Sequence, residues 1–176
     1  MEQNEFKSFI KLPDAGETKM CFYPFKLDTY GRGCTNNCSY CYAKSVLHFR
    51  KLWNNENPAV TDINKVKTIF EDVFDKNKKT KFSQLLLAKV PLRLGGMVDC
   101  FSEAERKNGV TLQLLKLLKE YEYPYLILTK NKLIGEDRYI EALDKDLGYI
   151  QFTITTPYDD ISKIYEEGAD TSSERL

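Results

Sequence analysis

The chain has 176 residues, 42% hydrophobic and 30% charged, which is normal for one globular domain with its own core. Its 26 basic residues balance 26 acidic ones, so the net charge of zero excludes a broad electrostatic attraction to nucleic acid or to a membrane surface. No apolar run approaches membrane-spanning length, and the polar N-terminus lacks the apolar stretch of a signal peptide. We therefore expect a cytoplasmic protein with reduced thiols and no membrane partner.

The predicted elements begin with an irregular lead-in over residues 1–26, where proline and glycine recur. A short strand is predicted over 25–30, and the loop after it contains three of the five cysteines. Apolar residues at helical spacing predict helices over 43–53 and 63–79, the second preceded by a Thr-Asp pair that can cap it.

The second half of the chain alternates strands with helices. Its predicted elements, in chain order, are a buried strand within 85–99 interrupted by Pro91, a helix over 109–121, a strand over 125–130, a helix over 136–147, a strand over 148–156 and a helix over 159–168. This alternation predicts an α/β fold with a parallel sheet of four strands, either a barrel or an open doubly wound sheet.

The end of the chain carries an unused helix signal. Thr171 is followed three places later by Glu174, the spacing of a capping box, but the chain stops before supplying a helix. Four parallel strands would also leave an open edge, which proteins normally cover. We therefore expect a truncated chain, or one half of a larger assembly completed by a partner chain.

Three cysteines lie within eight positions, at Cys34, Cys38 and Cys41. A [4Fe–4S] cluster usually takes four thiolates, so three would leave one iron open for a ligand. The alternative is a zinc site in which His48 supplies the fourth ligand, although zinc cysteines more often come in pairs and His48 falls inside a predicted helix. Cys21 and Cys100 are predicted to be ordinary small residues.

The spacing of these cysteines, with Tyr40 directly before the last, resembles the radical S-adenosylmethionine (SAM) superfamily. The resemblance implies that Cys34, Cys38 and Cys41 bind a [4Fe–4S] cluster. SAM would bind the open iron through its amino and carboxylate groups. Reductive cleavage would then give a 5′-deoxyadenosyl radical, with Tyr40 packed near the adenine.

The loop most resembles the branch that contains spore photoproduct lyase and DNA-repair-photolyase-like proteins. Gly33-Cys34 and Tyr40-Cys41-Tyr42-Ala43 match its pattern, whereas Tyr30 stands one place too early. The resemblance implies a partial (β/α) barrel of the radical SAM type, truncated after about four βα units, with residues 27–176 as the N-terminal portion of the core. No equivalent of that branch's hydrogen-donating cysteine can be assigned.

A second stretch, Val98–Glu105, resembles an acidic motif of the same branch, with Asp99 and Glu105 kept but both prolines and the glutamine absent. The residue three places before Glu105 is a serine, so a helix capping box and a role in the site both remain open for this glutamate. Gly95 and Gly96 precede the motif, where the resemblance implies contact with the methionine part of SAM.

Two later strand ends complete the resemblance. Lys130, in "ILTKN", is implied to reach the SAM carboxylate or ribose, a task that suits a flexible cation. In "QFTITT", Thr153 and Thr155 share one face of the predicted strand, and one of them is implied to face SAM.

The predicted function is a radical SAM enzyme, lyase-like, that acts on DNA lesions and takes electrons from a flavodoxin- or ferredoxin-type donor. Direct signs of nucleic-acid binding are weak. The lysines at 76, 78, 79 and 81 fit a solvated helix end, and the tyrosines at 121, 123 and 125 fit anchors of the core. A non-catalytic iron–sulfur electron carrier and a zinc-binding interaction module remain as alternatives.

Overall fold

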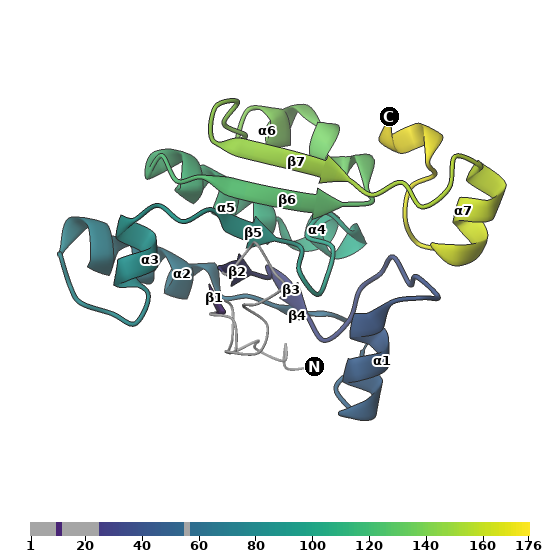
Figure 1. Ribbon diagram of the computed structural model, residues 1–176, viewed down its shortest axis with the longest axis horizontal. Helices are drawn as coiled ribbons and strands as arrows, with labels where there is room; N and C mark the ends of the chain where they lie inside the picture. The colour runs from purple at the N-terminus through teal and green to yellow at the C-terminus, as the bar shows by residue number, and fades with distance from the viewer. Residues whose placement is uncertain (1–9, 12–24, 55–56) are drawn as a thin grey trace.

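The structure, a computed structural model, describes residues 10–11, 25–54 and 57–176. Its main sheet has the strand order β1-β2-β5-β6-β7, in which β1 is antiparallel and the other four strands are parallel (Figure 1). The strands are β1 (Ile10–Lys11), β2 (Lys26–Leu27), β5 (Leu92–Leu94), β6 (Tyr125–Thr129) and β7 (Gly148–Phe152). The predicted α/β fold with four parallel strands is confirmed, and the described strands form an open sheet, which leaves barrel closure as a prediction.

The first predicted strand, 25–30, is wrong in its extent. It divides into β2 and a separate strand β3 (Tyr30–Gly31), which pairs with β4 (Ala59–Val60) in a second, two-stranded sheet. Asp28 lies at the division, and its carboxylate accepts hydrogen bonds from the amides of Gly96 and Met97 at 2.8 and 3.1 Å. These tertiary bonds direct the chain out of the main sheet before the cysteine loop. β1 also falls inside the lead-in predicted as irregular, and the rest of that lead-in up to residue 24 lies outside the described residues.

Several helices differ in length from their predictions. The helices and helical turns are α1 (Tyr42–Phe49), α2 (Ile63–Phe70), the π-helical η1 (Glu71–Asp75), α3 (Ser83–Leu87), α4 (Glu103–Asn108), α5 (Val110–Glu120), η2 (Lys132–Gly135), α6 (Asp137–Ile140), α7 (Asp159–Tyr165) and η3 (Ser173–Arg175). The buried strand expected within 85–99 keeps only the three residues of β5, because α3 takes the leucines before Pro91. The helix expected over 136–147 shrinks to α6.

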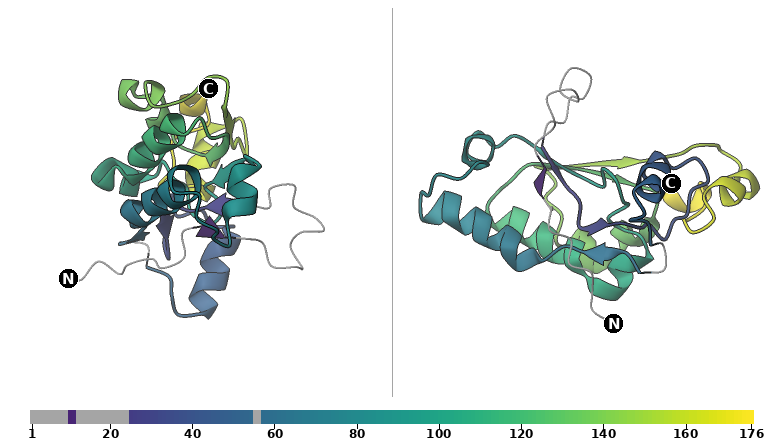
Figure 2. Two further views of the ribbon diagram at one scale, coloured as in Figure 1. Left: turned by 90° about the vertical axis from the view of Figure 1, so that its left-hand side faces the viewer. Right: turned by 90° about the horizontal axis from the view of Figure 1, so that it is seen from below.

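The core lies between the sheet and the helices that cover one of its faces, chiefly α2, η1 and α5 (Figure 2). Leu94 and Ile127 point from the sheet into this layer, where they meet Phe70 and Leu114 with no exposed surface. Each such side chain contributes roughly 1.5–3 kcal/mol by leaving water. The helix-covered face therefore fixes where the strand ends lie.

The tyrosines after α5 act as the sequence predicted, as core anchors. Tyr123 has no exposed surface, donates to the Val90 carbonyl at 2.6 Å and meets the Phe70 ring edge-on at 5.4 Å. Tyr125 is also buried. The lysine run is solvated, since Lys76 and Lys78 are exposed and pair with Asp72.

The predicted capping box near the C-terminus is confirmed. The Thr171 amide donates to the Glu174 carboxylate at 2.8 Å, and the Glu174 amide donates back to the Thr171 hydroxyl at 3.4 Å. The box opens the short turn η3. Across the described part of the chain, no helix has both the length and the apolar character needed to span a membrane.

Candidate functional site

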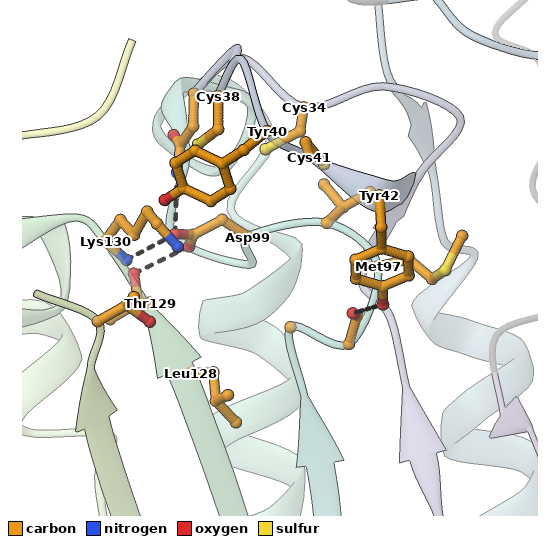
Figure 3. A pocket seen from close by; sticks show the side chains of 15 residues that line it. Cys34, Cys38, Tyr40, Cys41, Tyr42, Met97, Asp99, Leu128, Thr129 and Lys130 are labelled. Atoms are coloured by element: carbon orange, nitrogen blue, oxygen red, sulfur yellow. Dashed lines mark hydrogen bonds between the residues drawn. The ribbon is translucent and has the colours of Figure 1, made fainter. Parts of the chain in front are cut away.

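A pocket opens where the parallel strands end, beneath the cysteine loop (Figure 3). Eight of the nine residues predicted for the site line it, and Thr155 is the exception. The eight are Cys34, Cys38, Tyr40, Cys41, Gly95, Gly96, Lys130 and Thr153. The others that line it are Asn36, Tyr42, Met97, Val98, Asp99, Leu128 and Thr129.

The three loop cysteines are free thiols that face the same pocket (Figure 3). In residues 10–11, 25–54 and 57–176, no three His, Cys, Asp or Glu side chains are already arranged around a metal position. His48 does not complete a zinc set, because it stacks on Trp53 at 5.9 Å and is absent from the pocket lining. Three thiols on one short loop match the ligand number of a [4Fe–4S] cluster with one open iron, and His48 does not turn them into a zinc set of three cysteines and one histidine.

The thiols of Cys34 and Cys38 hold their protons strongly. Burial raises the pKa of Cys34 to about 12, and the nearby Asp99 carboxylate adds to the rise. Burial also raises the pKa of Cys38 to about 11, although the Lys130 ammonium opposes this shift. Ligation by metal must therefore displace these protons, and metal binding should release them.

Asp99 ties the cysteine loop to the strand ends. Its carboxylate accepts hydrogen bonds from the Asn36 amide group at 3.0 Å, the Thr129 hydroxyl at 2.9 Å and the Lys130 backbone N–H at 2.7 Å. Asn131 extends the network by donating to the Asn36 side-chain oxygen at 3.1 Å. The aspartate of the predicted acidic motif thus positions the loop and the end of β6 through its hydrogen bonds.

Gly95 and Gly96, which both line the pocket, have different structural roles. Gly95 has φ of +77°, and a Cβ there would lie 2.5 Å from the Leu128 carbonyl oxygen, so a side chain would collide with β6. Gly96 donates to Asp28, while its carbonyl accepts from the Tyr42 hydroxyl at 2.7 Å. The loop after β5 can therefore pack closely against its neighbours and leave space in the pocket.

Lys130, Tyr40 and Thr155 meet around one buried carboxylate, that of Glu166. The Lys130 ammonium lies 3.9 Å from Glu166 and 5.9 Å from the centre of the Tyr40 ring. The hydroxyls of Tyr40 and Thr155 both donate to Glu166. Thr155 thus points to this carboxylate and lies outside the pocket, whereas Thr153 lines it.

Glu166 is ionised in spite of its burial. Burial by itself would raise the pKa of this carboxyl. Hydrogen bonds from Thr155, Tyr40 and Arg175, with the positive charge of Arg175, outweigh that effect and hold the pKa below its usual value. Arg175 is 3% exposed and donates to Glu166 at 2.6 Å, so the two form a buried ion pair.

Glu105, left open between a site role and capping, is a core residue that caps α5. It has no exposed surface and accepts from the amides of Thr111 and Leu112 at 2.7 and 3.0 Å. The hydroxyls of Tyr30 and Tyr139 also donate to it. The capping box with Ser102 does not form, since the Ser102 hydroxyl has no hydrogen-bond partner among the residues that the structure describes.

The sequence reasoning missed Glu166 and Arg175, because no motif marks them and their contact with the loop depends on the fold. Asn36 was detectable in principle as a small polar residue inside the cysteine motif. Tyr42 and Met97 also line the pocket; Tyr42 belongs to the matched cysteine motif but was given no role, and Met97 gave no signal of its own. Cys21 lies outside the described residues, and Cys100, predicted to be an ordinary small residue, is buried in the core.

Comparison with known proteins gives a likeness in fold. No family model matches the chain, and no curated protein matches it. Among solved structures, the chain is similar to a spore photoproduct lyase double mutant with bound AdoMet and dinucleoside spore photoproduct, with a TM-score of 0.63 and 14% sequence identity. The match covers 97% of this chain and 44% of that one, so the chain spans less than half the length of that lyase. The chain therefore resembles part of that lyase in fold.

Proposed function

We propose that this protein binds a [4Fe–4S] cluster through Cys34, Cys38 and Cys41 and uses it to cleave SAM reductively. The observation that carries the proposal is the shared pocket: the three thiols face the same space as Tyr40, Lys130 and most other residues predicted for SAM. That space lies at the carboxyl edge of parallel strands, where α/β proteins usually bind ligands. The likeness in fold to a lyase with bound AdoMet supports the same reading.

The protein's own residues would bind and orient SAM. The Lys130 ammonium provides the positive charge for the SAM carboxylate, and the half-exposed Tyr40 ring offers an apolar surface for the adenine. The Leu128 and Met97 side chains line the pocket and would give a bound cofactor an apolar wall. The bound cluster would supply the electron that breaks the sulfonium bond.

We infer that the substrate is a lesion in DNA and the reaction lyase-like, because the neighbour in fold was solved with a dinucleoside spore photoproduct. The electron would come from an acidic flavodoxin- or ferredoxin-type protein in the reducing cytoplasm. The net charge of zero gives no general affinity for DNA, so the lesion would have to be recognised locally.

Anaerobic reconstitution with iron and sulfide tests the proposal. We expect a brown protein that absorbs light at about 400 nm, as a thiolate-bound cluster does. With dithionite it should convert SAM to 5′-deoxyadenosine and methionine. A cluster without SAM cleavage would support the electron carrier, and a colourless protein that contains zinc would support the interaction module.

Cysteine variants provide the matched control. Cys38→Ala should abolish iron binding, whereas Cys100→Ala leaves the three loop thiols in place and should bind iron as the wild type does. Incubation of the active protein with lesion-bearing dinucleotides then tests the substrate. Equal iron content in Cys38→Ala and the wild type would disprove the cluster assignment.

A further inference from the structure

A short segment at the end of α7 contacts the cysteine loop, and α7 lies near that loop in Figure 1. We call residues 165–168 the clasp. The Ser39 amide donates to the Tyr165 carbonyl at 2.8 Å, and the Gly168 amide donates to the Asn36 carbonyl at 3.0 Å. Two backbone hydrogen bonds thus join segments that are more than a hundred residues apart in the chain.

The clasp approaches so closely that only glycine fits at position 168. A Cβ on Gly168 would lie 1.9 Å from the Thr35 carbonyl oxygen and 2.9 Å from its carbon. Both atoms belong to the backbone of the cysteine loop, so no side chain can rotate away to make room. A methyl group at this position must push the clasp and the loop apart.

Glu166 connects the clasp to the pocket. Its side chain has no exposed surface, and it accepts hydrogen bonds from Tyr40, on the cysteine loop, and from Thr155. Arg175 holds the opposite side of the carboxylate and also donates to the Thr153 carbonyl at 2.7 Å. Thr155 and Arg175 therefore fix the position of the carboxylate that accepts the hydrogen bond from Tyr40.

The charges around Glu166 leave one cation available to a ligand. Arg175 neutralises Glu166 at 2.6 Å, whereas Lys130 lies farther off at 3.9 Å and also lines the pocket. The carboxylate attracts both cations and offsets the repulsion between them. If Glu166 lost its negative charge, the Arg175 and Lys130 side chains would repel each other at the pocket wall.

We propose that Glu166 is a positioning residue of the cofactor site, which acts through Tyr40, and that the clasp holds the cysteine loop against the strand ends. The role in SAM binding rests on the proposed function, whereas the hold on the loop does not. The loop needs such support, because between β3 and α1 it has no strand or helix of its own. The half-exposed Tyr40 ring would otherwise rotate freely about its side-chain bonds.

Hydrogen exchange of the cluster-free protein tests the clasp. In Gly168→Ala, the Ser39 amide should exchange roughly tenfold faster, since it loses an ordered acceptor. Gly135→Ala is the matched control, because a Cβ there meets nothing within 4 Å. Unchanged exchange at Ser39 in a folded Gly168→Ala protein would overturn the clasp. If that variant fails to fold, Glu166→Gln gives the same readout, with Asp160→Asn, an exposed carboxylate on α7, as its control.

A double-mutant cycle on SAM binding tests the action through Tyr40. With the reconstituted protein, Glu166→Gln and Tyr40→Phe should each weaken SAM binding about fivefold, the loss of one ordinary hydrogen bond. The double variant should be no weaker than Glu166→Gln alone, because that variant already removes the support that Tyr40→Phe removes. Iron content should stay equal throughout.

The outcomes separate the two proposals. Additive losses would show that Glu166 acts independently of Tyr40 and would overturn the positioning role. A wild-type protein that takes up no cluster or no SAM would overturn the proposed function, while the exchange result would still decide the clasp.

Discussion

The helix-covered face of the sheet and the cysteine loop are held in place by different interactions. The sheet face is held by apolar side chains with no exposed surface, such as Leu114 and Phe70. The loop is held by polar contacts that come from distant parts of the chain, including Asp99 and Glu166. The burial of apolar side chains stabilises without a preferred direction, whereas each hydrogen bond fixes the geometry of the two groups it joins. Changes in the first region should therefore alter global stability, and changes in the second should alter the site.

Removing apolar volume from the core should have the largest effect on stability. Leu114→Ala creates a cavity beneath the sheet and should lower the free energy of unfolding by about 3 kcal/mol. Urea denaturation followed by circular dichroism measures the change. Lys116→Ala, on the exposed side of the same helix, should change it by less than about 0.5 kcal/mol. Iron content per folded molecule should stay constant, and a fall would show that the two regions are coupled.

Glu105 tests whether a buried carboxylate belongs to the core or to the site. Glu105→Gln places an amide group against four donors and should cost about 2 kcal/mol of stability, because hydrogen bonds to a charged group are lost. The exposed Glu103→Gln on the same helix should be nearly neutral. Thermal or urea unfolding gives the comparison, and weaker SAM binding by folded Glu105→Gln would contradict the core assignment.

Asp99→Asn should affect the loop more than the core. The amide cannot accept all the hydrogen bonds that the carboxylate receives from Asn36, Thr129 and Lys130, so we expect a loss of about 1.5 kcal/mol. Hydrogen exchange should accelerate in the cysteine loop and stay unchanged in α5. Asp62→Asn is the control, since asparagine caps a helix as well as aspartate does. Equal acceleration in both places would mean that Asp99 stabilises the whole domain.

The smallest expected effect is the change in stability at low pH that comes from Glu166. The pKa of Glu166 is lowered from its usual 4.5, so the unfolded chain binds more protons in this range and stability rises with pH. The contribution is fully present above pH 4.5 and is lost as the pH falls through the folded pKa. Urea unfolding between pH 7 and about pH 3 should show a gap between wild type and Glu166→Gln that is constant above pH 4.5 and narrows below it. A gap that widens in acid would reverse the assigned sign.

The sequence predicted the strongly patterned parts of the fold well. The helix expected over 109–121 matches α5, and the strand expected over 125–130 matches β6 to within one residue. It failed where a tertiary contact decided the local structure. Asp28 ends β2 by bonding to the loop after β5, and residues 85–87 join a helix although their apolar run suits a strand as well.

The candidate site was predictable where residues lie close together in a motif or at a strand end. The cysteine spacing and Lys130 therefore pointed to residues that line one pocket in the structure. Thr155 did not line it, because β7 ends at Phe152 and the alternation of a strand does not continue beyond that point. Glu166 could not be found, since its hydrogen bond to Tyr40 spans 126 residues of chain that must first fold.

The complete burial of Cys100 supplies a second, independent reporter in the same molecule. Burial raises the pKa of its thiol well above the usual value, and its sulfur lies 3.7 Å from where a Cβ on Gly95 would stand. In a Cys21→Ser background, a brief pulse of an alkylating reagent will modify the buried Cys34 thiol whenever the cysteine loop opens alone. It will modify Cys100 only after the sheet itself has come apart, so a mass spectrum of the labelled chain can time both events in one sample.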